Sequence, residues 1–178
     1  MPPSGSKRLF LALWPDPAAR SRLTATQQSF AHDPGLQHAK PVSTQNIHLT
    51  LHFLGDVAEA SIAQLESCLA NVRAAPFSLN IDHWGYFPRP RVCWIGATQT
   101  PEALTSLLEQ TAACVAGVVE GYRQRDFKAH ITLFRKARHP LKIEAFDAWE
   151  WNVDRFVLVA SQTRPEGAEY TVVREWRL

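Results

Sequence analysis

The sequence contains two similar short stretches, each with the alternation of polar and apolar residues that is typical of a β-strand. The first is NIHLTLHFLGD at residues 46–56, and AHITLFRKA places its histidine 82 residues after the first histidine. Because successive side chains of a strand point to opposite faces, His48 and Thr50 share one face and the leucines beside them share the other. His130 and Thr132 repeat this arrangement. The fold must therefore accommodate two strands that each carry an imidazole and a hydroxyl in front of an apolar backing.

Apolar periodicity predicts that strands and helices alternate along the chain. Helical spacing is found in three segments, residues 16–32, 57–74 and 101–119. Strand-like runs are expected at residues 8–14, 46–55, 77–87, 92–98, 129–134, 151–161 and 169–178. The PRPR turn at 88–91 predicts a hairpin between the runs beside it, and the last two runs are expected to form another. This order predicts an α+β fold with helices packed on a largely antiparallel sheet.

Length and composition indicate a globular protein. A chain of 178 residues suffices for one domain, or for two small lobes that share a core, and no linker divides it, so 1–178 is expected to be a single domain. Hydrophobic residues make up 46% of the chain and charged residues 20%, which argues against disorder. No run approaches the roughly 18 apolar residues of a membrane helix. The run 8–14 ends in Trp-Pro-Asp, which predicts a buried strand, not a signal peptide, and makes the cytoplasm the expected compartment.

The three cysteines, Cys68, Cys93 and Cys114, are odd in number and widely spaced, and no C-x-x-C motif is present. This pattern indicates neither a disulfide framework nor a cysteine-based zinc site. We therefore expect buried free thiols, in keeping with the general tendency of cysteine to be buried.

Positive charge is concentrated around the second histidine motif, although the net charge of the whole chain is only +2. Residues 123–138 contain six lysines or arginines and one acid, Asp126, so this stretch carries +5 and the other residues together carry −3. A basic stretch of this kind predicts a site for an anionic ligand, and a solvated basic loop is the alternative.

Two strands of this kind lying side by side would bring two histidines and two threonines to one cleft. Near neutral pH one imidazole can be protonated while the other is neutral, because the ordinary pKa of histidine is about 6.5. One can take a proton from an attacking oxygen while the other gives a proton to the leaving oxygen, each transfer being worth typically ~10²–10⁴ in rate. Thr50, Thr132 and Arg135 would bind the non-bridging oxygens of a phosphate. The set predicts cleavage of a phosphodiester without a metal.

Strict alternation predicts which face of its strand each of three further side chains near the motifs occupies. His52 is on the predicted face of His48, so we expect it to line the cleft wall or to contact the ligand. Phe134 is on the predicted face of His130 and is the candidate for stacking on a base. Phe53 is on the predicted core face, where we expect it to pack.

These stretches resemble the 2H phosphoesterases, a superfamily named for two His-x-Thr/Ser motifs, and within it the RNA 2′,3′-cyclic phosphodiesterase family, also called the 2′-5′ RNA ligase family. The resemblance runs from KRLFLALWPD at 7–16 to YTVVREWRL at 170–178. It includes FLG after the first motif and Arg135 after the second. One departure is Ala129, where the family commonly has proline before the second histidine.

The resemblance implies a bilobal, pseudo-twofold fold, with antiparallel sheets lining a central cleft and helices packed outside. It also implies hydrolysis of RNA ends or nucleotides bearing a 2′,3′-cyclic phosphate to 2′-phosphomonoesters, with 2′-5′ ligation as the reverse reaction. By position, His48 is expected to be the proton donor to the leaving 3′ oxygen and His130 the proton acceptor that activates water, while Thr50 and Thr132 hold the phosphate. No cofactor, membrane association or obligate protein partner is expected, and we expect a monomer.

Three other functions account for parts of the same pattern. A zinc hydrolase using His48, His52 and His130 is disfavoured because positions i and i+4 of a strand lie roughly 13 Å apart at ~3.3 Å per residue. An RNA-binding module without catalysis would leave the doubled histidine–threonine pairs unexplained. A phosphodiesterase for another cyclic or 2′-5′-linked nucleotide is compatible with the motifs.

Overall fold

The fold is described from a computed structural model, which places residues 5–143, 146–165 and 167–178. Its helices are α1 (Pro17–Phe30), α2 (Glu59–Leu69) and α3 (Glu102–Val118), with short 3₁₀ turns at Pro34–Leu36 and Thr44–Asn46. Its strands are β1 (Ser6–Leu13), β2 (Lys40–Pro41), β3 (Leu49–Ala58), β4 (Phe77–Ile81), β5 (His83–Phe87), β6 (Val92–Gly96), β7 (His130–Arg135), β8 (Trp149–Val153), β9 (Arg155–Arg164) and β10 (Gly167–Arg177).

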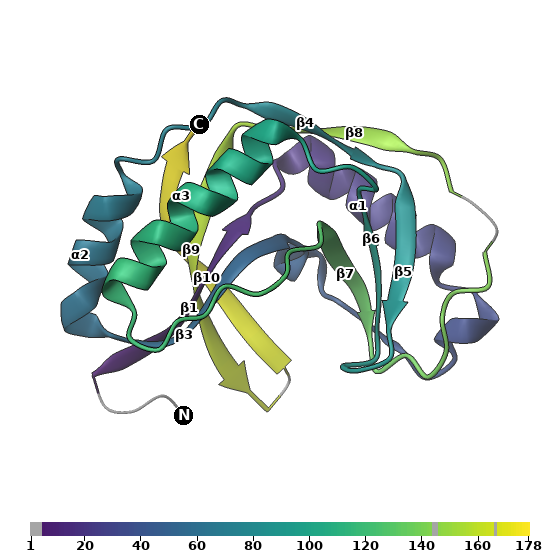
Figure 1. The fold of residues 1–178 in the computed structure, drawn as a ribbon. Coiled ribbons are helices and arrows are strands. Elements are labelled where there is room, and N and C mark those ends of the chain that lie inside the picture. The colour runs from purple at the N-terminus through teal and green to yellow at the C-terminus, as the bar shows by residue number, and fades with distance from the viewer. Residues whose placement is uncertain (1–4, 144–145, 166) are drawn as a thin grey trace.

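The main sheet is antiparallel and has the strand order β10-β9-β1-β3-β7-β6-β5, with β2 added beside β7. In the described part of the chain, β3 and β7 share a single residue pair, Leu49 with Ile131. The sheet therefore divides at this point into a β3 half (β10, β9, β1 and β3) and a β7 half (β7, β6, β5 and β2), as Figure 1 shows. The predicted α+β fold with an antiparallel sheet and two lobes is confirmed.

Two of the helices connect the halves of the sheet. Each of α1 and α3 follows a strand of one half in the sequence and packs against the other half. α1 follows β1, yet Gln27 donates hydrogen bonds to the carbonyls of Leu133 in β7, at 2.8 Å, and of Val42, at 2.9 Å. α3 follows β6, yet His52 of β3 donates a hydrogen bond to its Leu108 carbonyl. Figure 1 shows α2 and α3 outside the β3 half, and α1 outside the β7 half. Both faces that bear the histidine motifs are thus left uncovered by helices.

Burial explains why the predicted elements form. The apolar run at the start of the chain is a buried strand, as predicted, since Leu9–Leu13 are all buried. Asp16 caps α1 by accepting a hydrogen bond from the Ala19 amide, and Pro17 occupies the first helical position. No helix in the described ranges is long and apolar enough to cross a membrane.

Two predicted strands are each split in two, because the chain changes sheets within them. The run 77–87 becomes β4 and β5, with the break at Asp82, and β8 and β9 are separated by Asp154 in the same way. β4 pairs with β8 in a small separate sheet, whereas β5 and β9 belong to the main sheet. Strand-like residues continue through each break without a turn signal, so the sequence predicts one continuous strand in each place. Both predicted hairpins, β5–β6 and β9–β10, are confirmed.

The expectation that all three thiols are free is wrong. Cys68 of α2 and Cys114 of α3 form a disulfide, and only Cys93 is a buried free thiol among the described residues. The pairing depends on which faces of α2 and α3 meet, and cysteine spacing carries no information on how the two helices pack.

Candidate active site

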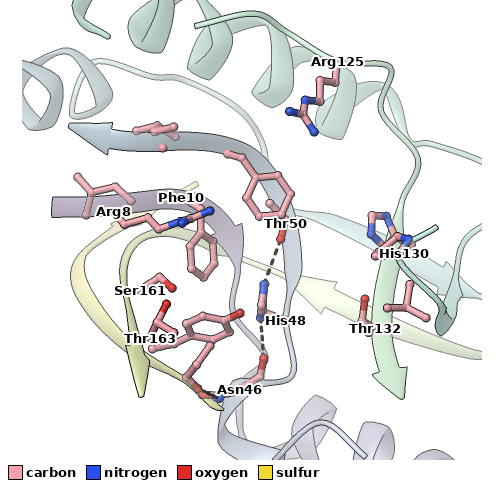
Figure 2. Close-up of a pocket in the computed structure, with 18 of the residues that line it drawn as sticks. Arg8, Phe10, Asn46, His48, Thr50, Arg125, His130, Thr132, Ser161 and Thr163 are labelled. Carbon is pink, nitrogen blue, oxygen red and sulfur yellow. Dashed lines mark hydrogen bonds between the residues drawn. The ribbon is translucent and has the colours of Figure 1, made fainter. Parts of the chain in front are cut away.

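A cleft of about 1090 Å³ lies between the two halves of the sheet. Its lining includes His48 and Thr50 from the β3 half and His130 and Thr132 from the β7 half, whose side chains are drawn in Figure 2. Further lining comes from β1, β9 and β10 on one side and from β5 and β6 on the other. The predicted meeting of the two motifs is therefore confirmed.

The single residue pair between β3 and β7 determines how the four side chains face one another. That pair lies one position after each histidine, and the strands are antiparallel. As a result Thr132 lies across from His48, and His130 lies across from Thr50, as can be followed in Figure 2. Each imidazole therefore faces the hydroxyl of the other motif across the cleft.

Both histidines are held in the same tautomer by their own backbone. Nδ1 of His48 donates to the Asn46 carbonyl at 2.6 Å, and Nδ1 of His130 donates to the Lys128 carbonyl at 2.8 Å. A carbonyl can only accept, so the proton is on Nδ1 and each neutral ring has an acceptor at Nε2. The Thr50 hydroxyl donates to Nε2 of His48 at 3.1 Å. The two Nε2 atoms are thus the atoms available for proton transfer.

His48 lies in an aromatic enclosure. Its ring stacks on Trp14 with centroids 5.5 Å apart, and Phe10 and Tyr170 contact it at 4.9 and 5.3 Å. Burial among these rings lowers the pKa of His48 to about 4, and the nearby charge of Arg135 contributes in the same direction, whereas its backbone hydrogen bond opposes the shift. His48 is therefore neutral at pH 7 in the empty cleft.

Fewer aromatic rings surround His130 than His48, and Lys128 lies nearby. Phe87 and Trp94 meet its ring edge-on, with centroids 5.1 and 6.1 Å away. Lys128 Nζ lies 4.5 Å from the centre of the Trp94 ring. Burial lowers the pKa of His130, and the positive charge of Lys128 adds to the effect, while the backbone hydrogen bond opposes it.

Each motif strand contains a bulge directly after its threonine. In β3, Thr50 and His52 pair with consecutive residues of β1, so Leu51 has no partner there. In β7, Thr132 and Phe134 pair with consecutive residues of β6, so Leu133 has no partner there. An extra residue of this kind reverses the alternation of faces beyond it. The repeat therefore extends from the sequence motif to an irregularity of the backbone.

The bulge in β3 makes the predicted places of His52 and Phe53 wrong. His52 is buried on the core side, where its Nε2 donates to the Leu108 carbonyl at 3.1 Å. Tyr122 donates from its hydroxyl to Nδ1 of His52 at 2.8 Å. Phe53, expected in the core, is 62% exposed and lines the cleft. His52 carries its proton on Nε2, the reverse of the two cleft histidines, which suits a structural role.

The bulge in β7 has the same effect on its strand. Phe134, expected on the face of His130, is buried in the core, so its predicted place is wrong. Arg135, which strict alternation would turn away, lines the cleft beyond Thr132, where it was predicted to meet the phosphate. In the two halves, Phe53 and Arg135 thus occupy equivalent positions.

Several arginines line the cleft, and only three of them come from the predicted basic stretch. These three are Arg123, Arg125 and Arg135, and Arg8 of β1 joins them from outside that stretch. Glu120 is the one acidic residue in the lining as described. The predicted anionic site is supported by this excess of positive charge, whereas Arg8 lies far from both motifs in the sequence and was not predicted to join them.

The aromatic enclosure of His48 and the polar side chains of β9 were not predicted from the sequence. Figure 2 shows Ser161 and Thr163 on the wall beside Phe10. They belong to strands distant from both motifs, so only the sheet order shows that they approach the cleft. The three histidines of the zinc alternative do not converge, since His52 lies behind β3, and the described residues contain no group of three or more histidine, cysteine, aspartate or glutamate side chains placed to hold a metal ion.

Residues 13–94 match the model of the LigT-like phosphoesterase family. The RNA 2′,3′-cyclic phosphodiesterase of Escherichia coli (strain K12) is 32% identical over 177 residues, which cover 98% of this chain and 98% of that protein. The chain belongs to the LigT-like phosphoesterase family. Another family member, the RNA 2′,3′-cyclic phosphodiesterase of Archaeoglobus fulgidus, is 33% identical over 178 residues, covering 94% of this chain and 98% of its own.

Solved structures of the family have the same fold. The crystal structure of E. coli LigT complexed with 3′-AMP superposes with a TM-score of 0.86 at 30% identity, covering 97% of this chain and 98% of LigT. LigT complexed with phosphate gives a TM-score of 0.83 at 30% identity, with 98% and 99% of the chains covered. The bilobal fold implied by the family resemblance is thereby confirmed.

Proposed function

We propose that this member of the LigT-like phosphoesterase family hydrolyses RNA ends that carry a 2′,3′-cyclic phosphate, giving 2′-phosphomonoesters. The observation that carries the proposal is the pair of Nε2 atoms, on His48 and His130, which face one arginine-lined cleft while each Nδ1 is held by the backbone. The names of the relatives, RNA 2′,3′-cyclic phosphodiesterase, support this choice of substrate.

The reaction uses the two histidines on opposite sides of the phosphorus. Nε2 of His130 accepts a proton from water as the water oxygen forms its bond to phosphorus. The bond from phosphorus to the 3′ oxygen breaks, and Nε2 of His48 gives that oxygen a proton. Thr50, Thr132 and Arg135 bind the non-bridging oxygens, whose charge grows in the transition state. The product keeps its phosphate on the 2′ oxygen.

Substrate binding prepares His48 for this role. Its low pKa leaves it neutral in the empty cleft, but a phosphate anion nearby favours the protonated imidazole. Once protonated, His48 is a stronger acid than an exposed histidine, because burial disfavours its charge. The Thr50 hydroxyl, which donates to Nε2 in the empty cleft, is then free to turn to the phosphate.

Phe53 takes the place of Phe134 as the platform for a base. It is exposed in the cleft, and its ring lies 6.2 Å from that of Phe10. Stacking on such a ring tolerates any base, because every base has an aromatic face. The nucleoside would therefore lie over the β3 half, and Arg135 would meet the phosphate from the β7 half.

The remaining parts of the proposal follow from this site. Both half-sites belong to one chain, so residues 1–178 act as one domain and as a monomer, without a protein partner. The chemistry of the histidines needs no metal or cofactor, and run in reverse it joins a 2′-hydroxyl to a cyclic phosphate. The compartment that we propose is the cytoplasm, where the Cys68–Cys114 disulfide is an unusual feature.

The test is hydrolysis, with EDTA present, of an oligoribonucleotide ending in a 2′,3′-cyclic phosphate. Wild type should form a 2′-phosphate that chromatography identifies, and His48→Ala and His130→Ala should each lower the rate by about 10²–10⁴. His139→Ala, at an exposed position that does not line the cleft, is the matched control. No turnover by wild type, or full turnover by either cleft variant, would overturn the proposal and favour another cyclic nucleotide or an RNA-binding module.

A further inference from the structure

The segment between α3 and β7 forms the upper wall of the cleft. Five of its residues line the cavity, and these are Glu120, Gly121, Tyr122, Arg123 and Arg125. Gly121 has a φ of +74°, a conformation that glycine adopts without strain, and it turns the chain sharply after the helix. The sharp turn brings the two arginines back over the cleft.

Tyr122 fastens this segment to the β3 half. Its hydroxyl donates to Nδ1 of His52 at 2.8 Å, and the two rings meet edge-on with centroids 6.0 Å apart. His52 is itself held by the Leu108 carbonyl and the Thr111 hydroxyl of α3, at 3.1 and 3.0 Å. Because both ring nitrogens of His52 are used inside the protein, it positions Tyr122 and does not bind a ligand. The hydrogen bond of Tyr122 thereby fixes the position of the backbone that carries Arg123 and Arg125.

Neither arginine is engaged within the described residues. The ion pairs there involve Lys7, Arg155, Arg164 and Arg177, and none of these residues lines the cleft. Arg123 and Arg125 also make no side-chain hydrogen bond in the described ranges, and Glu120, the acid of the lining, pairs with neither. Unpaired guanidinium groups in a cleft are suited to binding phosphate.

A cyclic mononucleotide has too few phosphates for this set. In the proposed reaction Thr50, Thr132 and Arg135 already bind the cyclic phosphate, which leaves the other arginines of the lining without a phosphate to bind. Figure 2 shows Arg125 well separated from Thr132, at the rim of the cleft. Exposed Phe53 lines the same cleft. A basic rim combined with an aromatic platform is the combination that single-stranded nucleic acid requires.

We propose that Arg123 and Arg125 bind internucleotide phosphates of the RNA chain, upstream of the cyclic end, so that RNA ends are preferred to free cyclic mononucleotides. The proposal rests on the proposed function and extends it from the reacting group to the length of the substrate. His52 and Tyr122 are positioning residues in this scheme, since they act through the two arginines.

The test compares 2′,3′-cyclic AMP with an oligoadenylate that ends in the same cyclic nucleotide. Wild type should have the higher kcat/KM for the oligonucleotide at low salt. The double variant R123Q/R125Q should lower the ratio of oligonucleotide to mononucleotide kcat/KM at least ~10-fold. For the oligonucleotide, the slope of log(kcat/KM) against log(salt concentration) should become shallower by about 1.4 in the double variant. Each phosphate contact to a single strand contributes roughly 0.7 to this slope, and two contacts are removed. Arg174→Gln removes a charge from an exposed part of β10 outside the cleft and is the control.

Tyr122→Phe tests the positioning role while keeping the aromatic ring. Loss of the hydrogen bond to His52 should raise KM for the oligonucleotide several-fold without lowering kcat, because the arginines lose their fixed point. Tyr86→Phe, which removes a hydroxyl bonded to the Ala137 carbonyl at 3.0 Å, is the matched control. A loss of kcat for both substrates with Tyr122→Phe would indicate a general structural role and contradict the positioning role.

The outcomes separate the two proposals. If wild type opens neither substrate, the proposed function fails. If it opens both through His48 and His130 but shows no preference that depends on Arg123 and Arg125, only the further inference fails. Inhibition of mononucleotide turnover by free ATP that requires these two arginines, without any RNA preference, would instead assign them to a nucleoside triphosphate.

Discussion

The β3 and β7 halves of the cleft share a backbone design and differ in the side chains placed on it. In both, a histidine donates from Nδ1 to the carbonyl two residues earlier, and a bulge follows the threonine. The next side chain to reach the cleft is then Phe53 in one half and Arg135 in the other. In the proposed function, the symmetric backbone places two histidines in equivalent positions, and the unlike residues after the bulges bind the substrate in one direction.

The two halves also differ in the side chains that surround their histidines. Three aromatic rings enclose His48 and bring its pKa to about 4, whereas His130 is reached by two aromatic rings and has Lys128 nearby. A histidine whose charge is disfavoured by burial gives up a proton readily once it has one. This difference agrees with His48 as the donor and His130 as the acceptor.

The largest expected effects come from removing either histidine, and a substrate that needs no acid separates their two roles. A 4-nitrophenyl phosphodiester has a leaving group that departs without a proton. On the cyclic substrate, His48→Ala and His130→Ala should each cost about 10²–10⁴ in rate. On the nitrophenyl substrate, His48→Ala should approach wild type while His130→Ala keeps its defect, as absorbance of the released phenolate can show. The reverse pattern would exchange the two roles.

The threonines offer the next test of the symmetry. Thr132→Val should lower kcat about 10²–10³-fold, the usual cost of removing one hydrogen-bond donor from the transition state. Thr50→Val should do the same and also raise the pKa of His48, because the hydroxyl that favours the neutral ring is gone. The measurement is the pH dependence of kcat/KM for both variants.

Serine at either threonine position retains the hydroxyl and is the control. Thr50→Ser and Thr132→Ser should recover most of the rate that the valine variants lack. Identical pH profiles for Thr50→Val and Thr132→Val would show that the bond between Thr50 and His48 has no influence on catalysis.

The side chains after the bulges provide a third test. Phe53→Ala should raise KM for RNA roughly 5–150-fold, which corresponds to ~1–3 kcal/mol for the absent base stack, with kcat little changed. Phe134→Ala should instead lower the free energy of unfolding by about 3–5 kcal/mol, because a core ring is removed. Steady-state kinetics and denaturant unfolding distinguish the two. An unchanged KM for Phe53→Ala would remove the base platform from the proposed function.

This contrast between Phe53 and Phe134 also shows how far the sequence could predict the site. Alternation was sufficient to predict that each histidine shares a face with its threonine, because those residues precede the bulges, and the repeat suggested that the two pairs meet. Beyond each bulge the same alternation assigns the wrong face. In the segment LHFLG, apolar residues occupy both odd and even positions, so either set could face the core. No local signal in the sequence therefore marks the extra residue of the bulge.

For the fold, too, features set by local sequence could be predicted, whereas features set by tertiary contacts could not. Helix and strand locations followed from periodicity, with Asp16 and Pro17 marking the start of α1. The breaks between β4 and β5 and between β8 and β9 depend on which strand lies alongside, and the Cys68–Cys114 disulfide depends on how α2 meets α3. Such interactions join residues far apart in the chain, and one sequence contains no pattern that selects them.

The smallest effect expected is on pH dependence. The profile of kcat/KM requires one histidine protonated and one neutral, so it should be a bell. Its acid limb should lie near pH 4, from His48, and its alkaline limb below pH 6.5, from the lowered pKa of His130. The optimum should therefore lie on the acid side of neutral. This bell has the same shape whichever histidine is the acid, so it tests the pair, while the nitrophenyl substrate assigns the roles.

The same pKa shift should appear in stability, without any substrate. The pKa of His48 is about 4 in the folded chain and about 6.5 when unfolded, so between these values the unfolded state binds more protons. The free energy of unfolding should therefore fall as the pH is lowered from 6.5 to about 4. His48→Gln cannot titrate and should show a shallower fall in urea denaturation across this range. A slope equal to that of wild type would mean that the aromatic enclosure does not hold His48 neutral, and the chemical contrast between the two halves would then rest on Phe53 and Arg135 alone.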